Sequence, residues 1–172
     1  MYPPIITDLE YIERKAEEKM KENYTFRVFL KGRDPDKTDR LVKEINDEVT
    51  SQIDCTKCAN CCKELEAGVT NDEIRKLAEL KNLVTEDFIK QYIREDDFER
   101  EPFLKHHPCT FLENNLCSIY DQRPKACRDF PNTHKPGFTS RTLGMINYYG
   151  ICPIVFNVME RLKLRMRFRF RY

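Results

Sequence analysis

Apolar residues recur at helical spacing through the first 53 residues of the chain. Thr7 and Glu10 have the spacing of a capping box, and the apolar positions that follow advance by three or four residues. These positions are Leu9, Ile12, Ala16, Met20, Tyr24 and Val28. Gly32 fits the end of this helix, and Asp34 followed by Pro35 fits the start of another. The second stripe consists of Leu41, Ile45, Val49 and Ile53. The pattern predicts two long helices that pack as an antiparallel pair.

Three more helices are predicted further along the chain. Thr70 and Glu73 repeat the capping-box spacing, with Val69 and Ile74 placed as a hydrophobic staple across it. Thr85 begins a short segment with acidic residues in its first turn. A closing helix is indicated by an apolar face made of Ile154, Val155, Val158, Met159 and Leu162.

Residues 102–153 differ from the preceding sequence in their proline content, because six prolines interrupt any long regular element. The only strand content expected is one short hairpin around Asn114 and Asn115. The acidic run at 94–101 is typical of a solvated loop. A segment this irregular needs something other than regular structure to hold it in place.

The predicted fold is therefore mostly α, a single small helical domain of 172 residues with a proline-rich, metal-stapled segment. Within it, residues 1–53 form the helical pair, residues 54–153 the cysteine-cluster region, and residues 154–172 the closing helix and a basic tail. The alternative is an α+β domain with a short hairpin near residues 109–119.

Composition and charge indicate whether the chain is a globular, membrane or secreted protein. The chain is 40% hydrophobic and 34% charged, which is typical of a globular domain. No apolar run approaches 18 residues, so no membrane span is expected. The first residues lack the features of a secretory signal, and we therefore expect a cytoplasmic protein whose cysteines are kept reduced.

Eight cysteines dominate the chemistry of the chain. A tight quartet has the pattern C-x2-C-x2-C-C, and a dispersed quartet follows it between residues 109 and 152. Clustered thiolates are soft ligands that select zinc, copper(I) or an iron–sulfur cluster. A disulfide framework and buried structural thiols are the alternatives, which the expected compartment and the clustering disfavour. The candidate metal ligands are Cys55, Cys58, Cys61, Cys62, Cys109, Cys117, Cys127 and Cys152.

The adjacent pair Cys61-Cys62 bears on how many sites there are. Neighbouring side chains diverge, so we expect one of the two to join Cys55 and Cys58 and the other to reach a second site or centre. The run also matches the first three ligands of a bacterial ferredoxin, although the rest of that pattern is absent. His106 and His107 precede Cys109 but are expected to be exposed or hydrogen-bonded imidazoles rather than ligands.

Basic residues around Cys127 are candidates for a supporting role. Arg123, Lys125 and Arg128 could compensate the negative charge of a thiolate site and orient its sulfur atoms. An ordinary basic surface explains them equally well.

Two blocks of sequence, DCTKCANCCK and PCTFLENNLCSIYDQRPKACRDFP, together resemble the bacterial and archaeal CxxCxxCC family, a proposed zinc- or iron-chelating domain that includes proteins of the YkgJ type. The second block matches its signature at Cys109, Phe111, Leu112, Cys117, Ile119, Tyr120, Arg123, Pro124, Cys127, Arg128, Phe130 and Pro131. The resemblance implies a metal-chelating domain whose ligands include the seven cysteines from Cys55 to Cys127. A related cysteine-cluster domain of flagellin lysine methylases is associated with an iron–sulfur centre.

The expected function is binding of Zn²⁺ through clustered cysteine thiolates, because zinc needs no assembly machinery and tolerates scattered ligands. One alternative is an iron–sulfur protein with redox or methyltransferase-like activity. Another is an interaction module with a purely structural metal. Whether the protein is an enzyme, and what its partners are, stays open.

The C-terminal residues 161–172 alternate basic and apolar side chains and hold six of the 30 Lys and Arg residues. Period-2 alternation predicts a strand that docks on the domain or on an anionic partner. Nucleic acid is the candidate partner, since cations attract phosphate and aromatic rings stack on bases. A flexible solubilising tail is the alternative.

Overall fold

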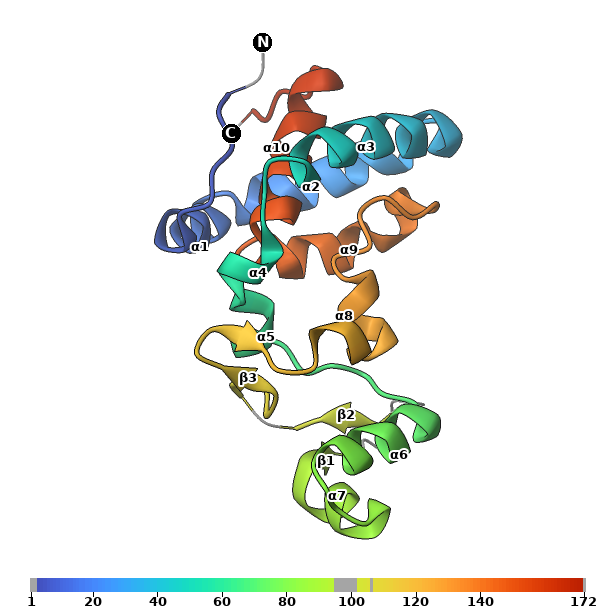
Figure 1. Ribbon diagram of the computed structural model, residues 1–172. Helices are drawn as coiled ribbons and strands as arrows, with labels where there is room; N and C mark the ends of the chain where they lie inside the picture. The colour runs from blue at the N-terminus through green and yellow to red at the C-terminus, as the bar shows by residue number, and fades with distance from the viewer. Residues whose placement is uncertain (1–2, 95–101, 106, 172) are drawn as a thin grey trace. The chain divides into compact units, whose positions relative to one another are not determined.

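The computed structural model describes residues 3–94, 102–105 and 107–171, and the described chain is mostly α, as predicted (Figure 1). It forms two compact units. The first, here called the helical unit, comprises Met1–Asp54 and Pro131–Tyr172, and the second, the cysteine unit, comprises Cys55–Phe130. The sequence-based prediction of a single domain for residues 1–172 stays a prediction. Within the described part of the chain, no helix is long and apolar enough to cross a membrane.

The helical unit is built around α10, Pro153–Arg165, which contacts α1, α3 and α9. The predicted apolar face of this helix is confirmed, and its neighbours Phe156 and Asn157 are buried as well. Asn157 replaces the polar interactions it loses to burial by binding the backbone of the N-terminal segment. Its side chain accepts a hydrogen bond from the Ile6 amide at 3.0 Å and donates to the Ile6 carbonyl at 2.7 Å.

The first predicted helix is two helices in the structure, α1 at Leu9–Glu18 and α2 at Met20–Lys31. Asp8, not Thr7, is the N-cap, and its carboxylate accepts from the Tyr11 amide at 3.0 Å. The break at Lys19 changes which side of the second helix faces the core. Phe26 and Leu30 are buried in α2, whereas Met20 is 55% exposed and Val28 is 66% exposed. The continuous apolar stripe was therefore wrong beyond Ala16.

Helix α3, Pro35–Thr50, begins as the sequence predicts. Asp34 is its N-cap and accepts from the Lys37 amide at 3.0 Å, with Pro35 in the first turn. Its main contacts are with α10 and α9, and α2 also packs mainly on α9. The leading helices therefore pack chiefly on elements from the far end of the chain, rather than on one another as the antiparallel pair expected from the sequence.

Helix α9, Phe138–Tyr148, lies in the segment where the sequence predicted no long element. No local side chain caps it. The Asp39 carboxylate on α3 accepts from the amides of Gly137 at 2.6 Å and Phe138 at 2.9 Å instead. A cap supplied from about 100 residues away leaves no local sequence signal, which is why this helix was missed.

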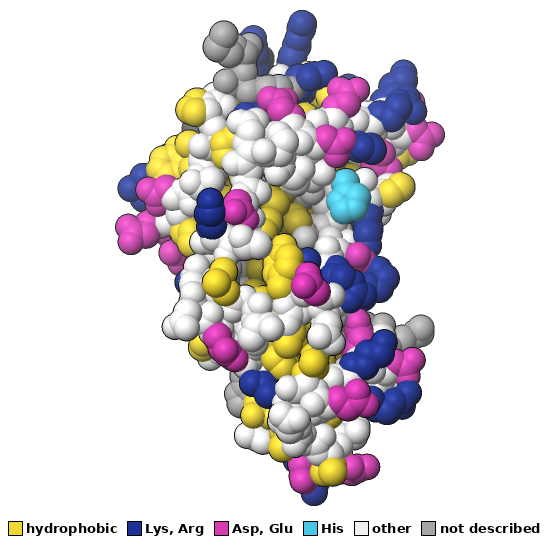
Figure 2. All heavy atoms as spheres, in the orientation of Figure 1, with side chains coloured by type: hydrophobic (Ala, Val, Ile, Leu, Met, Phe, Trp, Pro, Cys, Tyr) yellow, Lys and Arg dark blue, Asp and Glu magenta, His cyan; other side chains and the backbone are white. Residues whose placement is uncertain are grey.

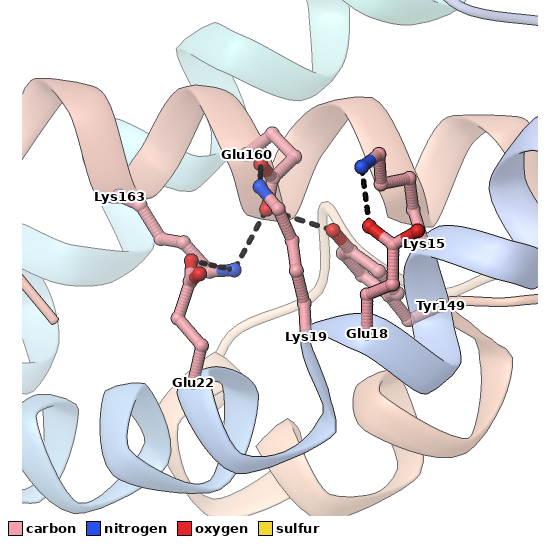
Figure 3. A network of polar contacts seen from close by, with 7 residues as sticks. All are labelled: Lys15, Glu18, Lys19, Glu22, Tyr149, Glu160 and Lys163. Atoms are coloured by element: carbon pink, nitrogen blue, oxygen red, sulfur yellow. Dashed lines mark hydrogen bonds and ion pairs between the residues drawn. The ribbon is translucent and has the colours of Figure 1, made fainter. Parts of the chain in front are cut away.

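A network of buried and half-buried charges joins α10 to α1, α2 and α9 (Figure 3). Lys163 is buried, and its ammonium group lies 2.7 Å from both Glu22 and Glu160. Glu160 also accepts a hydrogen bond from the Tyr149 hydroxyl at 2.8 Å and pairs with Lys19. Burial alone would raise the pKa of Glu160, but the charges of Lys163 and Lys19 keep that pKa below its ordinary value.

The basic tail does not form the predicted strand. Helix α10 continues to Arg165, where Leu162 and Lys163 are still buried, and residues 166–171 lie in no strand. Phe168 then folds back, with its ring centroid 5.0 Å from that of Phe26 and 5.2 Å from that of Phe29. The expected docking on the domain is therefore confirmed, but by a helix end and one aromatic side chain. The nucleic-acid partner stays a prediction.

The cysteine unit contains α4 at Cys55–Cys58, α5 at Asn60–Glu64, α6 at Asn71–Leu80, α7 at Thr85–Tyr92 and α8 at Lys125–Asp129. A short 3-10 helix covers Tyr120–Gln122. The Thr70 capping box is present in full, with the Glu73 carboxylate accepting from the Thr70 amide at 2.9 Å. The core of the unit consists of Val69, Ile74, Leu77, Ala78, Phe88, Ile93, Leu104 and Phe111.

Two small antiparallel hairpins complete the cysteine unit. Strands β1, Ile93–Arg94, and β2, Phe103–Leu104, pair beside the core; the intervening acidic run lies outside the described residues apart from Arg94. Strands β3, Leu112–Glu113, and β4, Leu116–Cys117, form the predicted hairpin. Asn114 and Asn115, between β3 and β4, both have positive φ, 50° and 64°, as a two-residue type I′ turn requires.

Candidate metal centre

The tight cysteine quartet lies on two very short helices separated by a sharp turn. Cys55 and Cys58 bound the single turn of α4, and Cys61 and Cys62 lie in α5. Between them Ala59 has φ of 50°, in the left-handed region that an alanine rarely adopts. This reversal of the backbone separates the two helices, so four cysteines in eight residues are not arranged along one continuous helix.

Backbone and side-chain hydrogen bonds tie the tight quartet to the second cysteine block. The Cys109 amide donates to the Cys62 carbonyl at 2.7 Å, and the Asn115 side chain donates to the Lys57 carbonyl at 3.3 Å. Helix α4 also contacts β4, which carries Cys117. Cysteines separated by about 50 residues are therefore brought to one place in the fold.

Four thiols form what we call the four-thiol group: Cys62, Cys109, Cys117 and Cys127. The charge of Cys62 acts on each of the other three thiols, and the charges of Cys109 and Cys117 act on Cys127. Burial raises the pKa of Cys109 and of Cys117, and it raises the pKa of Cys127 to about 12. A bound divalent cation would reverse this balance, because its charge favours the thiolate form.

Cys62 differs from the other members of the group. A hydrogen bond from Cys61 lowers the pKa of the Cys62 thiol to about 7, against the effect of burial, and the positive charges of Arg123 and Lys63 add to the lowering. The two adjacent cysteines thus have different surroundings. The charge of Cys62 acts on the cysteines of the dispersed block, and Cys61 donates the hydrogen bond that lowers the pKa of Cys62.

Arg123 is the candidate for compensating the negative charge of a thiolate site. Its guanidinium carbon lies 3.6 Å from the centroid of the Tyr120 ring, which holds the side chain in place. Its charge acts on Cys62, Cys117 and Cys127. The buried Nε of Arg123 has no hydrogen-bond acceptor within the described part of the chain. A thiolate sulfur would supply the acceptor that this group lacks.

Glu73 supports the segment that carries Cys127. Helix α8 has Pro124 as its N-cap residue and no cap from its own side chains. The Glu73 carboxylate, which already completes the capping box of α6, accepts from the Lys125 amide at 2.6 Å. Local sequence reasoning identified Glu73 as a capping residue, but not its contact with a segment 52 residues away.

Several predicted site residues lie apart from the four-thiol group. Within the ranges that the structure describes, no three Cys, His, Asp or Glu side chains converge as closely as the ligands of one metal ion. Cys152 is buried in the helical unit, where it is the N-cap residue of α10. His107 is exposed and lies 3.8 Å from Glu66, while His106 is outside the described residues.

Comparison with known proteins identifies a family. Residues 54–149 match the model of the CxxCxxCC family, described as a "Putative zinc- or iron-chelating domain". Neither a curated protein nor a solved structure matches the chain.

Proposed function

Because the chain belongs to the CxxCxxCC family, we propose that its cysteine unit binds zinc through cysteine thiolates. The single observation that carries the proposal is that the two cysteine blocks of the family motif meet in the fold, where the Cys109 amide donates to the Cys62 carbonyl at 2.7 Å and α4 contacts β4. The chemistry of this donor set fits a soft or borderline metal ion.

The proposed ligands are the seven cysteines of the cysteine unit: Cys55, Cys58, Cys61, Cys62, Cys109, Cys117 and Cys127. Deprotonated cysteine sulfur atoms are the ligands that zinc takes in structural sites, at about 2.3 Å. The different surroundings of Cys61 and Cys62 support a division of labour between the two. Cys152, in the other unit, stays a ligand predicted from the sequence alone.

Arg123 is proposed to orient and stabilise the thiolates. Four thiolates on a divalent ion carry a net charge of about −2, and a guanidinium whose buried Nε has an unused donor compensates part of it. Thiolate ligation also requires reduced cysteines, in agreement with the cytoplasmic location expected from the sequence. Zinc is favoured over an iron–sulfur cluster because it tolerates ligands from separate segments.

Purification under anaerobic conditions, followed by metal analysis and visible absorption, tests the proposal. A colourless protein with stoichiometric zinc is expected. A brown protein that contains iron and acid-labile sulfide would overturn zinc in favour of the cluster. A protein that holds neither metal after anaerobic growth in zinc- and iron-supplemented medium would overturn metal binding altogether.

Single substitutions locate the ligands. Cys62→Ser and Cys127→Ser should each abolish stoichiometric metal binding, and Arg123→Gln should weaken it roughly ten- to a hundredfold. Cys152→Ser is the matched substitution in the helical unit. Retention of all metal by this variant would exclude Cys152 as a ligand, whereas loss of metal would support the assignment made from the sequence.

A further inference from the structure

An open groove of about 450 Å³ lies in the cysteine unit between α6 and the segment that leads into α8. Leu77 and Pro124 form its apolar part, and both are buried. Its polar lining comprises Lys76, Gln122, Arg123, Arg128 and Glu73. The volume is within the range of pockets that hold a small molecule.

The charge of this lining is mainly positive. Three of the lining residues are cations, and Glu73 is the single carboxylate among them. Burial acts to raise the pKa of Glu73, but hydrogen bonds from the backbone of Thr70 and Lys125 lower it below its ordinary value. Both carboxylate oxygens of Glu73 accept hydrogen bonds from backbone amides, and its charge acts on Arg128 without a direct ion pair between these two described side chains.

The cations of the groove differ from those that lie in ion pairs along the helices. On the face drawn in Figure 2, acidic and basic side chains stand next to one another, and several Lys and Arg residues on the helices pair with a carboxylate three or four positions away. Lys76, Arg123 and Arg128 have no carboxylate partner among the ion pairs of the described residues. Two of these cations are guanidinium groups, which match the planar fork of an oxyanion.

We propose that the groove binds a small ligand that carries a phosphate or carboxylate group. The oxyanion would lie between Lys76 on α6 and Arg128 on α8, with the Gln122 amide as a further donor and Leu77 and Pro124 against the rest of the ligand. Arg123 links this site to the thiols, because its charge acts on Cys62 and Cys127. The inference does not depend on which metal the cysteines hold.

Isothermal titration calorimetry of the full-length protein, with its metal as purified, tests this inference with inorganic phosphate and with succinate as probes. Saturable one-to-one binding of at least one probe is expected. Arg128→Gln and Lys76→Gln should each weaken it about tenfold, since each removes one charge-assisted hydrogen bond. Tighter binding of phosphate would identify a phosphate-bearing ligand, and tighter binding of succinate a carboxylate-bearing one.

The matched control is Lys90→Gln, which removes one charge from α7 outside the groove. Equal weakening by this variant, or the absence of saturable binding for both probes, would overturn the inference. Lys76 lies on α6, which carries no cysteine, so the Lys76→Gln variant still tests the groove if Arg128→Gln disturbs Cys127. Metal analysis of each variant separates loss of the groove from loss of the metal site.

Discussion

The backbone at Gly150 passes so close to α1 that it has no room for a side chain. A Cβ at this position would lie 2.8 Å from the Cβ of Ala16, a distance that real Cβ atoms essentially never show. We expect Gly150→Ala to lower the free energy of unfolding by about 1–3 kcal/mol, because neither methyl group can move away without shifting a helix. Urea denaturation measures the change.

The control for this prediction is Gly144→Ala in the middle of α9. A Cβ there would meet nothing nearer than 3.9 Å, so the substitution should be neutral or stabilise by up to about 1 kcal/mol through helix propensity. The double variant Gly150→Ala with Ala16→Gly should recover stability relative to Gly150→Ala alone. If Gly150→Ala were as harmless as Gly144→Ala, the close approach of α1 would be wrong.

A second residue-scale prediction concerns Glu160 and pH. The pKa of Glu160 is lower in the folded protein than its ordinary value of 4.5, so its contribution to stability is present above pH 4.5 and is lost as the pH falls through the folded pKa. Glu160→Gln should lower the free energy of unfolding at pH 7 by roughly 2–3 kcal/mol, because Lys163 and Lys19 lose a charged partner.

Denaturation of wild type and Glu160→Gln between pH 7 and pH 3.5 checks the sign. The difference in stability between the two proteins should shrink as the pH falls below 4.5. Glu13→Gln, at an exposed position of α1, is the matched carboxylate change and should stay parallel to wild type. A difference that is independent of pH would mean that Glu160 acts through packing rather than charge.

At the scale of single elements, the end of α10 offers a direct test of the tail. The Phe168 amide donates to the Lys163 carbonyl at 2.9 Å and the Arg167 amide to the Leu164 carbonyl at 3.0 Å, which is the pattern of a Schellman motif. Arg167 occupies its left-handed position, with φ of 52°, where glycine is favoured. Arg167→Gly should therefore stabilise the protein by about 1 kcal/mol.

Arg169→Gly is the matched change for this prediction, since it removes the same side chain outside the motif. It should be neutral or slightly destabilising in the same urea denaturation experiment. A loss of stability on Arg167→Gly would show that the tail does not end the helix in this way, and it would bring back the predicted strand for residues beyond 165.

The elements that could be predicted from the sequence are those whose signals are local. The Thr70 box, the Asp34-Pro35 start and the Asn114-Asn115 turn each satisfy their own backbone within a few residues, and the structure confirms all three. Helix α9 could not be found this way, because its cap comes from Asp39 on another helix. The break at Lys19 was missed for a similar reason, since the choice of buried face in α2 is made by contacts with α9.

The candidate metal site, like the fold, could be predicted only where its signals are local. The motif identified the cysteines, because their spacing is a property of the sequence. Which thiols gather could not be predicted, since the meeting of Cys62 with Cys109 depends on a tertiary hydrogen bond. The sequence also could not predict that Glu73 contacts α8 or that the Nε of Arg123 lacks an acceptor within the described residues. It did identify Arg123 as a candidate for charge compensation.

At the scale of the whole molecule, the two units differ in what stabilises them. The helical unit has a large apolar core around α10, whereas the cysteine unit has short helices, two small hairpins and seven of the eight cysteines. Metal binding and folding are coupled wherever ligands come from segments with little core of their own. Removal of metal by a chelator should therefore raise amide hydrogen exchange across residues 55–130 and leave residues 9–50 and 138–165 protected.

The reciprocal change is Phe168→Ala, which removes the ring that packs on Phe26 and Phe29. It should raise exchange in α2 and at the end of α10, at a cost of about 2–3 kcal/mol for a partly buried aromatic side chain, and keep the metal content of wild type. Hydrogen-exchange mass spectrometry and metal analysis of the same preparation measure the amide exchange and the metal content. Loss of metal on Phe168→Ala, or deprotection of α10 by the chelator, would mean that the metal also stabilises the helical unit, and Cys152 would then be the residue to test for that link.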